Sequence, residues 1–278
     1  MKKCITKIAT ICVMTMLVLS FAACGIGRQI TDNIVDNITD NITEAVGEVV
    51  TTIVQEATAM AFDEMGGGPA IVLGAGSWDA HMSGDLYVRL VNNAISIQTH
   101  AEDTVRFEFS PPTTGEYVIP VAEFNRDLNR HEITEPPSNI TLGGDNRPGV
   151  LFIFVPMDMV AFTNMELRTT NGAARIIGNG EHLTNVVTIS IGNGIVELRD
   201  FDADIIIANA TNGTISGNGL GTSALEARTT NGVVTLRDSQ VSGNLTARTS
   251  TGSVTLERVD FDRDRSDLNA GVGILTVR

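Results

Sequence analysis

The stretch Ala227-Arg-Thr-Thr-Asn-Gly-Val-Val-Thr-Leu-Arg-Asp238 decides the fold class of this chain. A Thr-Asn-Gly turn lies at its centre, and the flanking residues alternate between apolar and polar side chains. The turn recurs as Asn171-Gly172, Asn193-Gly194, Asn212-Gly213, Asn231-Gly232 and Thr251-Gly252, and in a weaker form as Val272-Gly273. Successive turn glycines are 22, 19, 19, 20 and 21 residues apart, so residues 159–278 form one repeat array.

This period predicts a β-solenoid. Alternating residues around Asn-Gly are also the strongest short-range signal for a β-hairpin, but a hairpin does not account for a recurrence about every 20 residues. Short strands at a constant period are typical of coils that stack on one another. The residues two and four after each glycine, and those seven and five before it, are mostly apolar. We expect these positions to form columns inside the stack.

The turn residues themselves are interpreted as structural. Glycine can supply a positive φ at a corner, and Asn or Thr beside it tolerates the bend. Identical side chains stacked at the corner can also hydrogen-bond along the stack. The alternative is a ligand-binding row of Asn and Thr side chains on one face.

Residues 69–158 read as β-strands without the regular turn. Residues 85–91, 94–98, 104–109, 117–121 and 150–155 are apolar or alternate with period two. Residues 125–137 are charged and irregular, which predicts an exposed loop. The whole of 69–278 is expected to be all-β and to form one continuous domain.

The N-terminus has the pattern of a bacterial export signal. Lys2, Lys3 and Lys7 flank an apolar run that ends in Ala22-Ala23-Cys24. Small residues before a cysteine resemble the lipobox of lipoproteins, in which the cysteine carries a diacylglyceryl anchor. We therefore predict a signal peptide over 1–23, lipidation at Cys24 and a location on the outer face of the cell membrane. The alternatives are an ordinary secretory signal and an uncleaved anchor.

Residues 24–68 are predicted to be a helical stalk or linker. Apolar residues recur at steps of three and four from Ile30 to Ala57, which places a stripe along one side of a helix. Ile, Val, Thr, Asn and Asp are mediocre helix formers, so the helix needs a partner. A partly ordered polar stalk, a self-associating helix and an interfacial helix all stay open. Gly66-Gly-Gly-Pro69 ends the segment.

Charge excludes nucleic acid as a partner. Nineteen basic residues less the three lysines of the signal leave sixteen arginines against 33 acidic residues, so the mature chain carries 16 − 33 = −17. Such a chain is repelled by phosphate backbones and by anionic lipid headgroups. The lack of lysine in the mature chain also excludes Schiff-base chemistry and a phosphate-loop lysine.

Residues with catalytic or metal-binding chemistry are sparse. The four histidines do not have a zinc spacing, and there is no G-x-S-x-G. We therefore expect no catalytic residue and no cofactor. Weak calcium candidates are the alternate carboxylates of Asp200, Asp202 and Asp204 and of Asp260, Asp262 and Asp264. Solvated loop charge is the competing interpretation.

The repeats resemble those of the DUF4097 β-strand-repeat family, whose members carry the label adhesin. The matching segments are Ile153-Phe-Val-Pro156, Leu167-Arg-Thr-Thr-Asn-Gly172, Arg228-Thr-Thr-Asn-Gly-Val-Val-Thr-Leu236 and Arg248-Thr-Ser-Thr-Gly-Ser-Val-Thr-Leu256. The resemblance covers residues 80–278. It implies a β-solenoid-like, extracytoplasmic, non-enzymatic domain, and it assigns no catalytic residue.

Together these features favour a lipid-anchored adhesion, interaction or cell-envelope scaffold module that binds an unidentified protein or glycan. One alternative is an accessory sensory or regulatory protein of an envelope-stress system, and a second is a β-helix enzyme that acts on polysaccharide. Self-association through the stalk or through the C-terminal coil is also expected, because the chain ends on an uncapped strand, Ile274–Arg278.

Overall fold

The computed structural model describes residues 67–79, 84–112, 117–136, 148–157 and 160–278, with the side chains of 74–79 left aside. The predicted signal peptide, Cys24 and nearly all of the predicted stalk lie outside these residues. No helix within the described residues is long and apolar enough to cross a membrane.

The described residues are nearly all strand, which confirms the all-β prediction. The first half contains seven strands: β1 (Ile71–Asp79), β2 (Gly84–Leu90), β3 (Ala94–His100), β4 (Thr104–Ser110), β5 (Val121–Asn125), β6 (Arg130–Thr134) and β7 (Val150–Pro156). The repeat half contains β8 (Phe162–Ile177), β9 (His182–Arg237), β10 (Gln240–Glu257), β11 (Asp260–Phe261), the short 3-10 helix η1 (Arg263–Arg265), β12 (Ser266–Asn269) and β13 (Val272–Val277).

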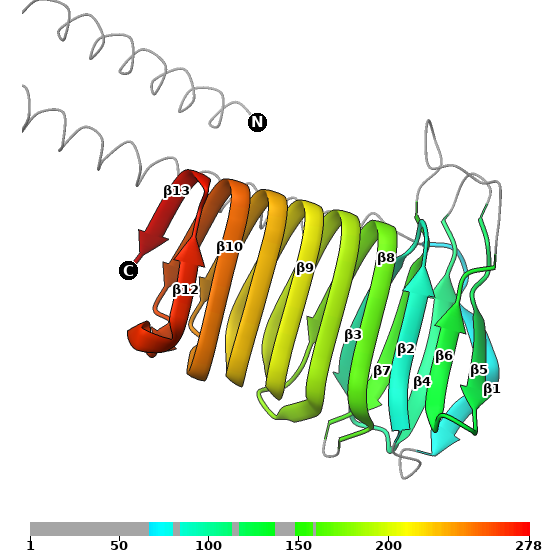
Figure 1. Cartoon of the computed structure of the whole chain (residues 1–278). Helices are drawn as coiled ribbons and strands as arrows, with labels where there is room; N and C mark the ends of the chain where they lie inside the picture. The colour runs from blue at the N-terminus through cyan, green and yellow to red at the C-terminus, as the bar shows by residue number, and fades with distance from the viewer. Residues whose placement is uncertain (1–66, 80–83, 113–116, 137–147, 158–159) are drawn as a thin grey trace, which may run out of the picture. The chain divides into compact units, whose positions relative to one another are not determined.

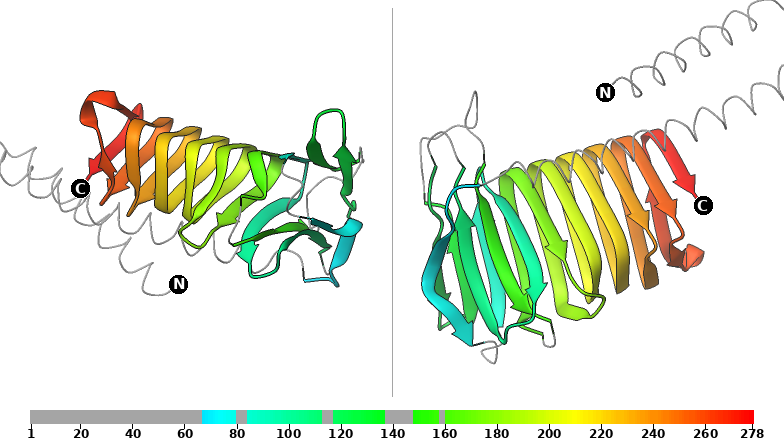
Figure 2. Two further views of the ribbon diagram at one scale, coloured as in Figure 1. Left: turned by 90° about the horizontal axis from the view of Figure 1, so that it is seen from below. Right: turned by 180° about the vertical axis from the view of Figure 1, so that it is seen from behind.

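Each of the long strands passes through a turn glycine and so belongs to two faces of the molecule. The residues of β8 before Gly172 pair with β2, and those after it pair with β3. We call the two sides the pre-glycine face and the post-glycine face. The path β1-β4-β7-β3-β8-β2-β6-β5 therefore runs along one face and returns along the other. Figure 1 shows the pre-glycine strands in front, and the right view of Figure 2 shows the post-glycine strands.

Successive passes of the chain pair in parallel and in register. Gly172 pairs with Gly194 between β8 and β9, and Gly252 pairs with Gly232 and with Gly273 on its two sides. The predicted interior columns are buried from Met165 to Leu256 in one hydrophobic core. Only the last pair, Leu275 and Val277, is exposed, because no described strand lies beyond β13.

Glycine is required at the turn mainly because the coils approach each other there. A Cβ on Gly194, Gly213, Gly232, Gly252 or Gly273 would lie 1.5–1.8 Å from the carbonyl oxygen of the preceding turn glycine. The φ angle is positive only at Gly194, Gly232 and Gly252. The prediction of a positive-φ corner is thus correct for half of the turns, and close backbone contact explains the rest.

The asparagines form the expected ladder. The side chain of Asn193 donates to Asn171 at 2.7 Å, Asn212 donates to Asn193 at 2.9 Å, and Asn231 donates to Asn212 at 2.8 Å. Asn171 continues the row to Asn92, at 3.1 Å. Each exposed amide therefore has a partner in a neighbouring coil.

A second column of left-handed residues stands at the opposite corner, six residues after the turn glycine. Asp200, Asp238 and Arg258 have φ values of 52°, 45° and 53°, and Gly219 has 65°. No single residue type marks this corner in every coil, so the repeat pattern does not predict it. Aspartate tolerates the left-handed region better than most residues, and the Arg258 guanidinium binds the Asp238 carboxylate at 2.6 and 2.8 Å.

The prediction of a loop over 125–137 is wrong for its central part. Residues 125 to 134 complete a hairpin in which β5 and β6 pair antiparallel, and β6 pairs in parallel with β2. His131 and Ile133 of β6 are buried, and the His131 ring contacts the rings of Phe107, Phe124 and Phe162. Burial lowers the pKa of His131. The alternation at residues 130–134 was present in the sequence but was masked by its charges.

Candidate functional site

A groove of about 1060 Å³ runs across the coils on the pre-glycine face. It crosses every pass of the chain from β2 to the segment that joins β12 to β13. Its residues come from three consecutive columns, at four, three and two residues before the turn glycine. The repeat that builds the fold therefore also builds the groove.

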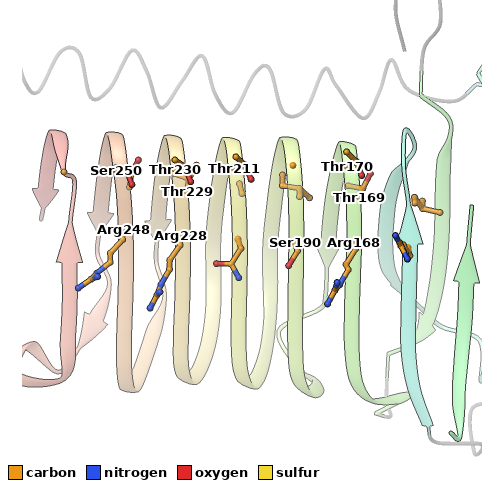
Figure 3. A pocket seen from close by; sticks show the side chains of 18 of the residues that line it. Arg168, Thr169, Thr170, Ser190, Thr211, Arg228, Thr229, Thr230, Arg248 and Ser250 are labelled. Carbon is orange, nitrogen blue, oxygen red and sulfur yellow. The ribbon is translucent and has the colours of Figure 1, made fainter. Parts of the chain in front are cut away.

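The first wall of the groove is cationic and polar. It contains Arg89, Arg168, Ser190, Asn209, Arg228, Arg248 and Asn269. The four arginines are exposed. Figure 3 shows Arg168, Arg228 and Arg248 pointing the same way out of the strands. The register places Arg228 beside Arg248 in adjacent passes of the chain.

Acidic residues in the neighbouring column hold three of these arginines. Arg168 binds Glu166 at 2.5 Å, Arg228 binds Glu226 at 3.0 Å, and Arg248 binds Asp267. These pairs are exposed, so each contributes less than about 1 kcal/mol to stability. Arg89 has no ion pair within the described residues. Weak pairing orients these three guanidinium groups, and the three arginines stay exposed.

The second wall is a column of hydroxyls. Thr170, Thr211, Thr230 and Ser250 are exposed along it, with Gly192 and Gly271 in the remaining coils. Figure 3 shows these hydroxyl side chains in a row near the turn. Adjacent parallel strands are about 4.8 Å apart, so the row presents a regular series of donors and acceptors.

The floor consists of inward-pointing residues. Thr169, Thr229 and Thr249 are buried there, beside Ile191 and Ala210. A buried hydroxyl needs a partner. Thr229 donates to Gly213 O at 3.5 Å, and Thr249 donates to Thr251 O at 2.9 Å, with Gly232 O at 3.4 Å as a second acceptor within reach. These two floor threonines thus donate to backbone carbonyl oxygens at the turns, whereas the wall residues are exposed to a ligand.

The groove can form hydrogen bonds and ion pairs along an extended polar ligand. The described residues that line it include no carboxylate, imidazole or thiol. A general base would be drawn from those groups in most enzymes. Of the Asn and Thr side chains that could form a ligand row, the Asn ladder lies outside the groove. The groove uses the Arg and Thr columns.

The calcium candidates are not brought together. The described residues contain no cluster of three or more His, Cys, Asp or Glu residues that could hold a metal ion. Asp262 instead accepts a hydrogen bond from Asp264 N at the start of η1, at 3.0 Å, and Arg265 lies 3.5 Å from its carboxylate. The calcium hypothesis gains no support from this arrangement.

Comparisons with known proteins add little. No protein-family model matches the sequence, and no curated protein matches it. Among solved structures, the chain resembles a crystal structure from Clostridium sporogenes that is provisionally described as a cell adhesion protein. The identity is 10%, the TM-score is 0.39, and the match covers 75% of this chain and 98% of that one. The resemblance to the DUF4097 family therefore rests on the quoted sequence segments alone, and no family membership follows.

Proposed function

We propose that this chain is a lipid-anchored β-solenoid that acts without catalysis as an adhesion or envelope-scaffold module. The observation that carries the proposal is the groove, in which each coil contributes one residue to a wall of arginine, serine and asparagine side chains and one to a wall of mostly threonine and serine hydroxyls. Parallel register, one turn glycine per coil and a shared interior core support the solenoid architecture. The lipobox-like Ala22-Ala23-Cys24 supports the anchor.

An extended ligand fits this surface better than a small molecule. The groove crosses every pass from β2 to the segment that joins β12 to β13, so a linear polymer can contact several coils at once. Each contact is weak by itself, and their number supplies the affinity. The polar walls indicate a hydrated ligand such as a wall glycan, a host glycan or an extended polar peptide.

The experiment measures binding of the purified chain to immobilised peptidoglycan, anionic wall polymer and host matrix protein. The variant Arg168→Ser/Arg228→Ser/Arg248→Ser removes three guanidinium groups from the groove. Hydrogen bonds to charged groups contribute about 1.5–3 kcal/mol each, so we expect at least a tenfold loss of affinity for the bound polymer. Binding to none of the three probes contradicts the proposal.

The matched control is Arg199→Ser on the post-glycine face, which should leave binding unchanged. If this variant loses as much affinity as the triple groove variant, then general charge and not the groove mediates binding. The anchor is tested separately. Cys24→Ser should move the protein from the membrane fraction to the soluble fraction and abolish incorporation of labelled palmitate. Incorporation that persists in this variant contradicts lipidation at Cys24.

A further inference from the structure

The arginines of the groove fall into two adjacent pairs. Arg89 of β2 is the register partner of Arg168 of β8, and Arg228 of β9 is the register partner of Arg248 of β10. All four are exposed, and Figure 3 shows three of them pointing the same way out of the strands. Like charges directly opposite each other on neighbouring strands destabilise a sheet. An anion held between the two guanidinium groups of a pair offsets that repulsion.

A neutral stretch separates the two pairs. The coils that contribute Ser190 and Asn209 lie between those of Arg168 and Arg228, and the asparagine ladder shows that these coils stack in chain order. Adjacent strands lie about 4.8 Å apart, so this gap is about 14 Å long and the whole row of four arginines is about 24 Å long. A ligand must therefore be extended to contact both pairs.

The first pair carries an excess of positive charge. Arg168 binds Glu166, and Arg89 has no ion pair within the described residues, so this pair has two cations and one carboxylate. The second pair is balanced by two carboxylates, Glu226 and Asp267. We therefore expect an anion to bind more strongly at the first pair than at the second.

The groove crosses the strands on the face of a sheet and does not follow a strand edge. The strands beneath it are paired with their neighbours in parallel register, so an extended peptide finds no free edge to which it could add a strand. The apolar floor residues Ile191 and Ala210 are buried, and they offer little surface to apolar side chains of a peptide. The exposed hydroxyls of Thr170, Thr211 and Thr230 instead match the hydroxyl groups that every unit of a glycan carries.

We propose that the groove binds an acidic glycan strand in which charged sugars are separated by neutral ones. This inference rests on the proposed function of the groove as a polymer-binding surface. The anionic groups bind at the two arginine pairs, because a guanidinium group presents parallel N–H donors to an oxyanion. The neutral sugars cross the coils of Ser190 and Asn209, and the sugar hydroxyls form hydrogen bonds with the threonine column.

The neutral stretch also selects against dense charge. Duplex DNA carries one negative charge per about 1.7 Å, so some of its phosphates would face Ser190 and Asn209 without a cation. The charge of −17 on the mature chain opposes such a ligand further. A sparsely charged glycan meets less of this repulsion, because exposed charges more than about 8 Å apart are largely screened at physiological ionic strength.

Calorimetric binding of oligosaccharides to the purified full chain tests the proposal. Hyaluronate alternates a uronic acid with a neutral sugar, chitin oligosaccharides contain only neutral sugars, and polygalacturonate carries a charge on every sugar. The hyaluronate octasaccharide is long enough to join both arginine pairs, and the disaccharide is not. We expect the octasaccharide to bind at least about tenfold more tightly than the disaccharide, and at least about tenfold more tightly than the chitin octasaccharide. The galacturonate octasaccharide should bind more weakly than the hyaluronate one.

Variants locate the charge that is responsible. Arg89→Ser/Arg168→Ser removes the first pair and should abolish the gain in affinity from disaccharide to octasaccharide. Serine at both arginines of the second pair should also abolish that gain, with a smaller total loss of affinity. The matched control, Arg263→Ser/Arg265→Ser in η1, removes the same charge from an exposed site outside the groove and should leave binding unchanged. The thermal midpoint of each variant shows that it is folded.

Several results overturn this inference and leave the proposed function standing. They are equal affinity for the hyaluronate and chitin octasaccharides, an octasaccharide that binds no more tightly than the disaccharide, and tighter binding of the galacturonate octasaccharide. Tighter binding of an acidic peptide of alternating aspartate and glycine has the same meaning. So does binding of the chain to peptidoglycan, anionic wall polymer or host matrix protein without binding to any of these oligosaccharides. Failure to bind any probe overturns both proposals.

Discussion

Glycine can be required at a position because a Cβ would contact the neighbouring coil or because the backbone is left-handed. Three glycines of this chain separate these two causes. Gly213 has the contact without the strain: its Cβ would lie 1.8 Å from Gly194 O, and its φ is not positive. Gly180 has the strain without the contact, with φ at 87° and no atom within 4 Å of the Cβ position. Gly232 has both, with φ at 154° and a contact of 1.7 Å.

The cost of Gly213→Ala follows from this distance. Ordinary contact begins at 3.4 Å, so the neighbouring coil must move by about 1.6 Å. Overpacking of this kind costs about 1–3 kcal/mol, and the movement also weakens one or two ladder hydrogen bonds of about 1 kcal/mol each. We expect Gly213→Ala to lower the free energy of unfolding by about 3–4 kcal/mol. Gly180→Ala should cost only about 1–2 kcal/mol of left-handed strain.

Thermal unfolding followed by circular dichroism measures the difference. For a domain of this size, about 1 kcal/mol corresponds to a Tm shift of about 2–4 °C. Gly213→Ala should therefore lower Tm by about 10 °C, Gly180→Ala by about 4 °C, and Gly232→Ala by at least as much as Gly213→Ala. If Gly180→Ala proves as costly as Gly213→Ala, the close approach of the coils is not what selects glycine.

Three further predictions concern single polar groups. Asn193→Ala removes two exposed hydrogen bonds of the ladder and should cost about 1 kcal/mol in urea unfolding; a cost above about 3 kcal/mol would mean that the ladder holds the coils together. Glu197→Ala removes the carboxylate of the buried ion pair with Arg175 and should lower the free energy of unfolding by about 3 kcal/mol. Glu257→Ala, at a more exposed pair, should lower it by less than about 1 kcal/mol, and equal costs would contradict the role of burial. Because burial lowers the pKa of His131, the unfolded chain takes up its proton first, so stability should fall as pH drops through the ordinary histidine value of 6.5; His131→Phe should flatten that part of the profile, and an unchanged profile would assign the effect to other groups.

The interior of the repeat half was predictable because the repeat displays it several times. Val234 and Leu236 could be assigned to the core from one copy only by alternation, but their aligned counterparts in other copies fixed the register. The Asn ladder followed from the same alignment, since identical side chains meet when coils stack in register. A wrong register would have had to place apolar residues at the same positions in every copy of the repeat.

Some features could not be predicted from the aligned repeats, because no single residue type marks them in every copy. The opposite corner is occupied by Asp200, Gly219, Asp238 and Arg258, which share a backbone conformation and no side-chain chemistry. β6 was missed because Arg130 and Glu132, which pair at 2.7 Å, outweighed the alternation of His131 and Ile133. The groove was not predicted because its arginines occur in only some of the coils, with Ser190, Asn209 and Asn269 in the others.

The opposite corner has a consequence for changes in chain length. The pre-glycine and post-glycine registers hold between β8 and β9 and between β9 and β10, so the extra residues of the longer glycine spacings lie where the chain returns from the post-glycine to the pre-glycine face, beyond Gly178, Asp238 and Arg258. The extra residue between Gly232 and Gly252 produces a register shift between Val241 and Asn244, and η1 fills the longer spacing before Gly273. Insertions and deletions should therefore accumulate at that edge, where a foreign loop could be grafted without disturbing the groove.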